Sequence, residues 1–555
     1  MATFLDYLHG HVFVYIALAV LIAIGCSALL SRKEQRAVFS SGDTLPGAPA
    51  GRAPFWVVLV SVALAWVWIV LMPIGYGHRD EIALLTQPLQ PTMYSGRFFP
   101  LGHMEFNLIS LSLTEGALEP LYILPFLQLL AVIFFIDRIV SPAGALVRIY
   151  AMALSFLVAL VVPFVNLIVP ERNAIFFLLA SLYFIKRYRE APGFLMVALA
   201  VASAAISLYY KEPMFALWVG VAFGLFCYDF GSLVRHAREP LAKGDVPRLL
   251  GSIQLGLSLS TVFFVLGYVF FVFYKGAPES YYAGGGGGAG LPDRFLTFVR
   301  DVPLLTVLIL TGVGAHLFIP RNSFDRGLTV ALCIGGVGYL SALIVLSLPL
   351  NGYYYAIPVL LQVICSAILL KHLAAVLFGA SGRSVKVLLS MGFAAVFGAG
   401  LVYGVFAVTK GVYNYVRIDI ATKKNYHAEY AFIYSELKAQ GDIRSVYYAP
   451  RTTRYNDYST AVLMTFIHTA GVDHKFDIYS ESGCAVWNES YNGGLIHCVK
   501  KDFNNVDDYD VLVIENDSLA DLDKSKYRVL KLDSPFEGRD DQRGSIVIAV
   551  RQGKQ

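Results

Sequence analysis

The chain has 555 residues, of which 56% are hydrophobic and only 15% are charged, and its formal net charge is +4. Soluble proteins carry about 25% charged residues, so this composition excludes an ordinary soluble protein of this length. The small net charge argues against nucleic-acid binding, and the mean hydropathy of +0.59 indicates a membrane protein.

Long apolar runs follow one another from residue 12 to about residue 409, whereas residues 410–555 have the polar content of a globular domain. About 20 apolar residues cross the ~30 Å hydrocarbon core of a bilayer. We therefore predict a polytopic α-helical transmembrane domain (1–409, about 12 helices) and a small soluble α/β domain (410–555). The predicted spans are 12–30, 54–73, 117–136, 148–169, 173–185, 193–209, 213–230, 250–273, 302–319, 327–348, 353–371 and 385–409.

The loops between these spans form two alternating sets that differ in basic residues. One set is rich in Lys and Arg, including Arg138, Lys186 and Lys371, and is predicted to be cytoplasmic. Basic residues also follow the first apolar run, which indicates a retained helix with its N-terminus outside. An even number of spans then puts the C-terminal domain outside, in the periplasm of a bacterial inner membrane; one miscounted span would move it to the cytoplasm.

Two outer loops stand out in this topology. The first, residues 75–116, places Asp80 and Glu81 directly after the second span and contains short amphipathic stretches that suit interfacial helices. Another, residues 274–300, contains five consecutive glycines, which cannot form a stable helix or strand. We expect a substrate-gated flap here, with a plain linker as the alternative.

Outer-face cations and tyrosines are the remaining candidates for a site. Arginine and lysine both bind phosphate, and tyrosine rings stack on sugars. The alternatives are local ion pairs such as Lys211 with Glu212, and an interfacial tyrosine belt. Glu105 is expected on a solvated loop face, with an acceptor-site carboxylate as the alternative. The candidate phosphate-binding residues are Arg97, Arg172, Lys211 and Lys275, and the candidate substrate-contacting aromatics are Tyr281, Tyr282, Tyr353, Tyr354 and Tyr355.

The Asp80-Glu81 pair after an early span, at the start of a long outer loop, resembles the glycosyltransferase C (GT-C) superfamily, as does the aromatic segment Asn351–Pro358. Protein O-mannosyltransferases and lipid A aminoarabinose transferases are similar in this respect. The resemblance implies an enzyme that takes a sugar from a polyprenyl-phosphate carrier on the outer face. It also implies that a first-loop Asp acts as the base and that the C-terminal domain is soluble and lies outside. One extra span precedes the Asp-Glu helix, and no second carboxylate motif matches.

The chemistry of the candidate residues agrees with this resemblance. A carboxylate such as Asp80, assisted by Glu81, can take the proton of an acceptor hydroxyl. The alternatives are a helix cap or a partner of Arg79 for Asp80, and an ion pair with Arg79 or Arg97 for Glu81. Outer cations can neutralise the leaving phosphate. No zinc-type spacing is present, and whether Asp80 or Glu81 holds a divalent metal through oxygen stays open.

The C-terminal domain contains alternating helix and strand patterns and no phosphate-binding loop or nucleophile elbow. Cys484 and Cys498 predict a disulfide if the domain faces an oxidising compartment, with two free thiols as the alternative. The predicted helices are 429–439 and 459–470, and the predicted strands are 445–448, 511–515, 527–532 and 546–550.

Three other functions remain open. A transporter or lipid flippase is the first, although the chain has no internal repeat and few ionisable residues deep in its spans. An O-antigen polymerase or ligase also uses lipid-linked glycans, but it relies on an outer loop with arginines and a histidine, which is not found here. A scaffold would leave the long first loop without a purpose. The sugar, and whether the acceptor is a glycan, a lipid or a protein, are not readable from the sequence.

Overall fold

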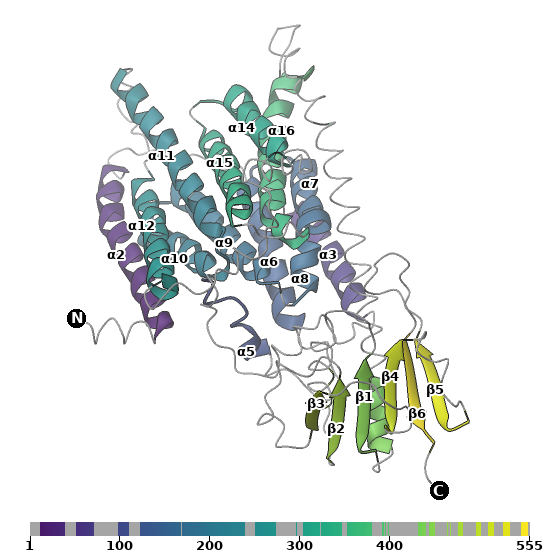
Figure 1. The fold of residues 1–555 in the computed structure, drawn as a ribbon. Helices are drawn as coiled ribbons and strands as arrows, with labels where there is room; N and C mark the ends of the chain where they lie inside the picture. Colours follow the sequence, from purple (N-terminus) through teal and green to yellow (C-terminus); the bar gives the residue numbers. More distant parts are fainter. Residues whose placement is uncertain are drawn as a thin grey trace, which may run out of the picture.

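A body of helices and a six-stranded sheet make up the described part of the chain (Figure 1). The structure is a computed structural model. It describes residues 11–38, 52–71, 98–109, 122–167, 169–238, 250–273, 304–321, 323–346, 352–379, 431–439, 443–449, 475–480, 496–500, 509–515, 525–532 and 546–552, with single positions at 296, 391, 392, 395, 398, 463 and 467.

Each predicted span up to 353–371 coincides with a helix. The predicted span 385–409 lies outside the described residues apart from single helical positions. The helices are α2 Val12–Val38, α3 Ala53–Leu71, α5 Phe106–Ile109, α6 Ile123–Val140, α7 Ala145–Ser155, η3 Phe156–Leu160, α8 Val161–Val165, α9 Glu171–Glu190, α10 Phe194–Tyr210, α11 Met214–Arg238, α12 Gly251–Tyr268, η4 Val269–Phe273, α14 Leu304–Phe318, α15 Phe324–Val345, η5 Gly352–Tyr355 and α16 Ala356–Gly379.

Length and composition identify the helical body as a membrane domain. Within the described ranges, seven helices are long and apolar enough to cross a bilayer. The apolar stretches Ala53–Trp66, Phe194–Tyr210 and Leu304–Phe318 are shorter. The chain is therefore a polytopic helical membrane protein, and the finer count of about twelve spans stays a prediction.

The predicted span 148–169 is one continuous helical segment with an irregular turn. It is built from α7, the π-helical turn η3 and α8. Proline has no backbone N–H, and its ring clashes with the carbonyl four residues earlier, which for Pro163 belongs to Ala159 in η3. A π turn at this position lets the helix continue past the proline.

Helices α11 and α15 pack with their backbones in direct contact. A Cβ atom built on Gly220 would lie 2.8 Å from the Cα of Gly335, and one built on Gly224 would lie 2.5 Å from the Cα of Ala331. Small residues allow such close approach, which strengthens dispersion contacts where no hydrophobic effect drives helices together. This contact holds α11 and α15 together in the helical body. The helices α10 and α16 of the same body carry residues of the candidate site.

The C-terminal strands form one mixed sheet in the order β3-β2-β1-β4-β6-β5. Strands β3, β2, β1 and β4 run parallel, whereas β6 pairs antiparallel with both β4 and β5. In Figure 1 the sheet lies beyond the end of the helical body at which α5 is found. The strands are β1 Ser445–Ala449, β2 Phe476–Ser480, β3 Ile496–Lys500, β4 Val511–Glu515, β5 Tyr527–Leu532 and β6 Ile546–Arg551.

The four predicted strands are confirmed as β1, β4, β5 and β6, and residues 431–439 of the predicted helix 429–439 are helical. Strands β2 and β3 were not predicted. The carboxylate of Asp510 accepts hydrogen bonds from the backbone N–H groups of Arg444 and Ser445, at 2.8 and 3.0 Å. Asp510 therefore fixes the entry of β4 beside β1 and has a structural role.

Candidate functional site

The predicted site residues fall into two groups with respect to the structure. Arg172, Lys211 and the tyrosines at 353–355 are described. The strand β3 includes the backbone of Cys498, but its predicted disulfide partner is not described. The predicted residues outside the described ranges are Asp80, Glu81, Arg97, Lys275, Tyr281, Tyr282 and Cys484.

The returning part of the first outer loop, residues 98–109, lies against the helical body. Phe98 is fully buried and packs on the rings of Tyr209, Phe264 and Phe271, with centroids 5.5–6.1 Å away. The backbone N–H of Leu101 donates a hydrogen bond to the carbonyl of Tyr209, at 3.1 Å. These contacts hold the loop across the C-terminal ends of α10 and α12.

This loop segment carries Glu105, which forms an ion pair with Arg172. Arg172 Nη2 lies 2.8 Å from Glu105 Oε1, and Nη1 donates to the carbonyl of Leu167 at 3.1 Å. Both side chains are buried, with exposed fractions of 0% and 6%. The predicted solvated position of Glu105 is therefore wrong, because the loop folds back onto the start of α9 and Arg172 draws the carboxylate inward.

Lys211, which follows α10, is the second buried cation at this end. Its Nζ lies 2.9 Å from Glu171 Oε1. Lys211 thus has a carboxylate partner from a neighbouring helix, which the local alternative of a pair with Glu212 did not include. The helix α9 begins two residues earlier than the predicted span, so Glu171 lies in its first turn and contacts the neighbouring helix end.

Aromatic rings surround the same ammonium group. Lys211 Nζ lies 4.4 Å from the ring centre of Tyr354, 6.0 Å from that of Tyr353 and 5.9 Å from that of Phe99. A desolvated cation over such rings gains about 2 kcal/mol. The tyrosine turn η5 and the first outer loop therefore converge on Lys211.

Burial affects the protonation of one carboxyl group at this end, that of Glu105. Burial raises the pKa of Glu105 above its ordinary value, and the positive charge of Arg172 and the side chain of Asn173 only partly oppose this effect. Glu171 is fully buried, and its Oε2 has no hydrogen-bond partner among the described residues. We call Glu105, Arg172, Glu171, Lys211 and Tyr354 the outer charge cluster.

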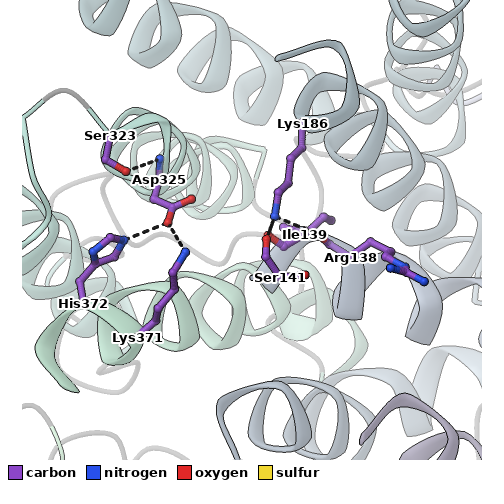
Figure 2. Close-up of polar contacts among 8 residues, drawn as sticks. All are labelled: Arg138, Ile139, Ser141, Lys186, Ser323, Asp325, Lys371 and His372. Atoms are coloured by element: carbon purple, nitrogen blue, oxygen red, sulfur yellow. Dashed lines mark hydrogen bonds and ion pairs between the residues drawn. The ribbon is translucent and has the colours of Figure 1, made fainter. Parts of the chain in front are cut away.

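Figure 2 shows a second set of polar contacts. These contacts involve the C-terminal halves of α9 and α16, whose N-terminal ends lie at the outer charge cluster. Asp325 Oδ2 contacts Lys371 Nζ at 2.7 Å and His372 Nε2 at 2.9 Å. Lys186 Nζ donates to three backbone carbonyls at the end of α6, those of Arg138, Ile139 and Ser141. Tyr354 lies in η5, directly before α16, and Lys371 lies in the C-terminal half of α16, so these two sets of contacts mark the two ends of the body.

The sequence did not single out the paired carboxylates Asp137 and Asp325. Asp137 forms a two-bond pair with Arg148, at 2.7 and 2.8 Å, in which both side chains are buried. A signal was available, because acids close to apolar spans are costly unless they are paired. With Lys186 and Lys371, these residues form what we call the inner charge cluster; which compartment each end faces stays a prediction.

Within the described ranges, no group of three or more His, Cys, Asp or Glu side chains could hold a metal ion. No protein-family model matches the chain, and no curated protein matches it. Fold and site together define a polytopic helical membrane protein with a charge cluster at each end. The resemblance to the GT-C superfamily therefore continues to rest on the sequence.

Proposed function

We propose that the chain is a membrane glycosyltransferase that transfers a sugar from a polyprenyl-phosphate donor to an acceptor hydroxyl on the outer face of a bacterial inner membrane. The observation that supports this proposal most is the outer charge cluster. Two predicted phosphate-binding cations, Arg172 and Lys211, come from separate helices and lie buried with the tyrosine turn at one end of the body.

Burying these charges costs free energy, which favours a role in binding a ligand. Ionisable groups at membrane depth are expensive, and they persist where they pair or serve a ligand. A lipid-linked phosphate must be bound where the acyl chain stays in the bilayer and the head group meets water. Cations at the end of a helical body, beneath a long loop, meet both requirements.

The proposed reaction is a direct displacement. The acceptor oxygen attacks the anomeric carbon, and the bond from that carbon to the phosphate oxygen breaks, so the phosphate leaves with the bonding electrons. Asp80 takes the acceptor proton, with Glu81 assisting. Arg172 and Lys211, together with Arg97 and Lys275, stabilise the charge on the leaving phosphate. Tyr281, Tyr282 and the tyrosines at 353–355 contact the substrates, and the C-terminal domain lies in the periplasm.

The direct test is Asp80→Asn, which keeps the shape of the side chain and removes the base. Membranes with wild-type or variant protein are incubated with a panel of radiolabelled polyprenyl-phosphate sugars, and released polyprenyl phosphate is measured. We expect normal expression and unfolding temperature with transfer lowered by about 100- to 10,000-fold. Near-normal turnover by this variant rules out the assignment.

A transport assay separates the proposal from its main rival. Protein in liposomes is given a labelled lipid-linked sugar on one side. Movement of the intact lipid without any covalent product contradicts the transferase and favours a flippase.

A further inference from the structure

The two cations of the outer charge cluster are held by carboxylates in pairs with a single contact. Resting on the function proposed above, we propose that Glu105 is an exchangeable counter-ion that competes with the donor phosphate for Arg172. Glu105 thereby sets the affinity for the donor. It is a residue that tunes binding and has no part in proton transfer to or from the reacting atoms.

The geometry of the pair supports exchange. Oε1 of Glu105 contacts Nη2 of Arg172, whereas Oε2 of Glu105 has no hydrogen-bond partner among the described residues. Nη1 of Arg172 donates to the carbonyl of Leu167. At the other end of the body, Arg148 is held by both oxygens of Asp137. Guanidinium prefers two parallel bonds to one anion. A phosphate can supply them, so Arg172 has more to gain from a new partner than Arg148.

The location of Glu105 supports exchange as well. It lies on the loop segment 98–109, just before the short helix α5, and not within a spanning helix. Loops move at lower cost than the elements they connect. Displacing this carboxylate would break one ion pair without breaking the backbone hydrogen bonds of a membrane helix.

The replacement of Glu105 by phosphate on Arg172 should depend on pH, because Glu105 can be charged or neutral. The charged or titratable groups that interact with Glu105 are Arg172 on α9 and Tyr210 on α10, and the amide of Asn173 is also close. Burial raises the pKa of Glu105, so this carboxyl takes up a proton more readily than an exposed one. When a phosphate replaces Glu105 on Arg172, the released carboxylate loses its cation and its pKa rises further.

Donor binding should therefore be accompanied by proton uptake. At pH values below the pKa of Glu105 in the free protein, the group is already neutral and Arg172 is available. Above that pKa, the ionised carboxylate must be displaced or protonated first. The affinity for a phosphodiester should fall as pH rises through this pKa.

The test measures binding of methyl farnesyl phosphate to the purified full-length protein in detergent, by calorimetry, from about pH 5 to about pH 8. This probe is a phosphodiester, so its own charge is constant over that range. The variants are Glu105→Gln, which removes the charge, and Glu105→Asp, which retains it. The matched control is Asp325→Asn, which removes a paired carboxylate at the other end of the body.

We expect Glu105→Gln to bind the probe about tenfold more tightly than wild type near neutral pH, with an affinity that no longer falls as pH rises. Glu105→Asp should keep the pH dependence, and Asp325→Asn should bind as wild type does. If Glu105→Gln does not fold, the pH dependence of the wild type still decides, because a flat profile contradicts the inference.

The experiment distinguishes failure of the counter-ion role from failure of the donor site. Binding by the wild type that is unchanged in Glu105→Gln overturns the counter-ion role and leaves the donor site intact. Absence of probe binding in every variant at every pH overturns the donor site, and with it the proposed function.

Discussion

The two ends of the helical body hold buried charge in different ways. At the inner charge cluster, Arg148 has a two-bond pair with Asp137, and Lys186 is satisfied by three backbone carbonyls. At the outer charge cluster, Arg172 and Lys211 each meet a carboxylate through a single contact. Lys371 in the inner cluster also meets its carboxylate through a single oxygen, so the contrast lies between Arg148 and Lys186 at one end and Arg172 and Lys211 at the other.

This difference suggests that the inner charges stabilise the fold and that the outer charges are arranged for a ligand. A buried cation that is fully satisfied by the protein gains little from an added anion. A cation with a single exchangeable partner gains more, particularly where water is excluded. Variants that remove matched groups at the two ends test whether the ends differ in this way.

The largest effect on stability is expected at the inner end. Asp137→Ala leaves Arg148 buried without its carboxylate, which costs about 3–5 kcal/mol of unfolding free energy. Thermal unfolding in detergent measures this, with the exposed pair variant Glu190→Ala as the control. If Asp137→Ala unfolds at the wild-type temperature, the inner pair does not support the fold.

A smaller effect, on binding, is expected at the outer end. Lys211→Met removes a charged hydrogen-bond donor to the phosphate, worth about 1.5–3 kcal/mol, and should weaken the binding of polyprenyl phosphate by about 10- to 100-fold. The matched control is Lys371→Met, which removes a lysine from a carboxylate pair of similar length at the inner end. Equal losses of affinity in both variants would contradict a binding site that is specific to the outer end.

The smallest effect should come from the contact that lies between the ends. Gly224→Ala places a methyl group against the backbone of Ala331 and should cost about 1–3 kcal/mol of unfolding free energy. Affinity for polyprenyl phosphate should stay at the wild-type value in the folded fraction. Thermal unfolding and ligand binding of the same preparation check both expectations, and a wild-type unfolding temperature would contradict the close packing.

The spans and most of the strands could be predicted because their signals are local. Apolar length determines a membrane helix, and runs such as those of β4 and β6 are apolar enough to be buried strands. Strands β2 and β3, with the sequences FDIYS and IHCVK, have polar residues at their second and fifth positions and so contain no such run. Their strand structure depends on parallel pairing with β1 and with each other.

The candidate site could be predicted only as a set of residue types. Arg172, Lys211 and Tyr354 were identified from their positions at span ends, which the sequence shows directly. Their partners were not, since Glu105 and Arg172 are 67 positions apart and pairing at that distance depends on how the loop folds back. Local reasoning offered Glu212 as a partner of Lys211 beside a phosphate role, whereas the structure pairs Lys211 with Glu171 across a helix interface.

The most direct test of the account is a cryo-electron microscopy map of the full-length protein with bound polyprenyl phosphate. The account predicts phosphate density within hydrogen-bond distance of Arg172 or Lys211, with the isoprenoid chain running along the membrane helices. Phosphate density at Lys186 and Lys371, with the outer charge cluster unchanged, would contradict it.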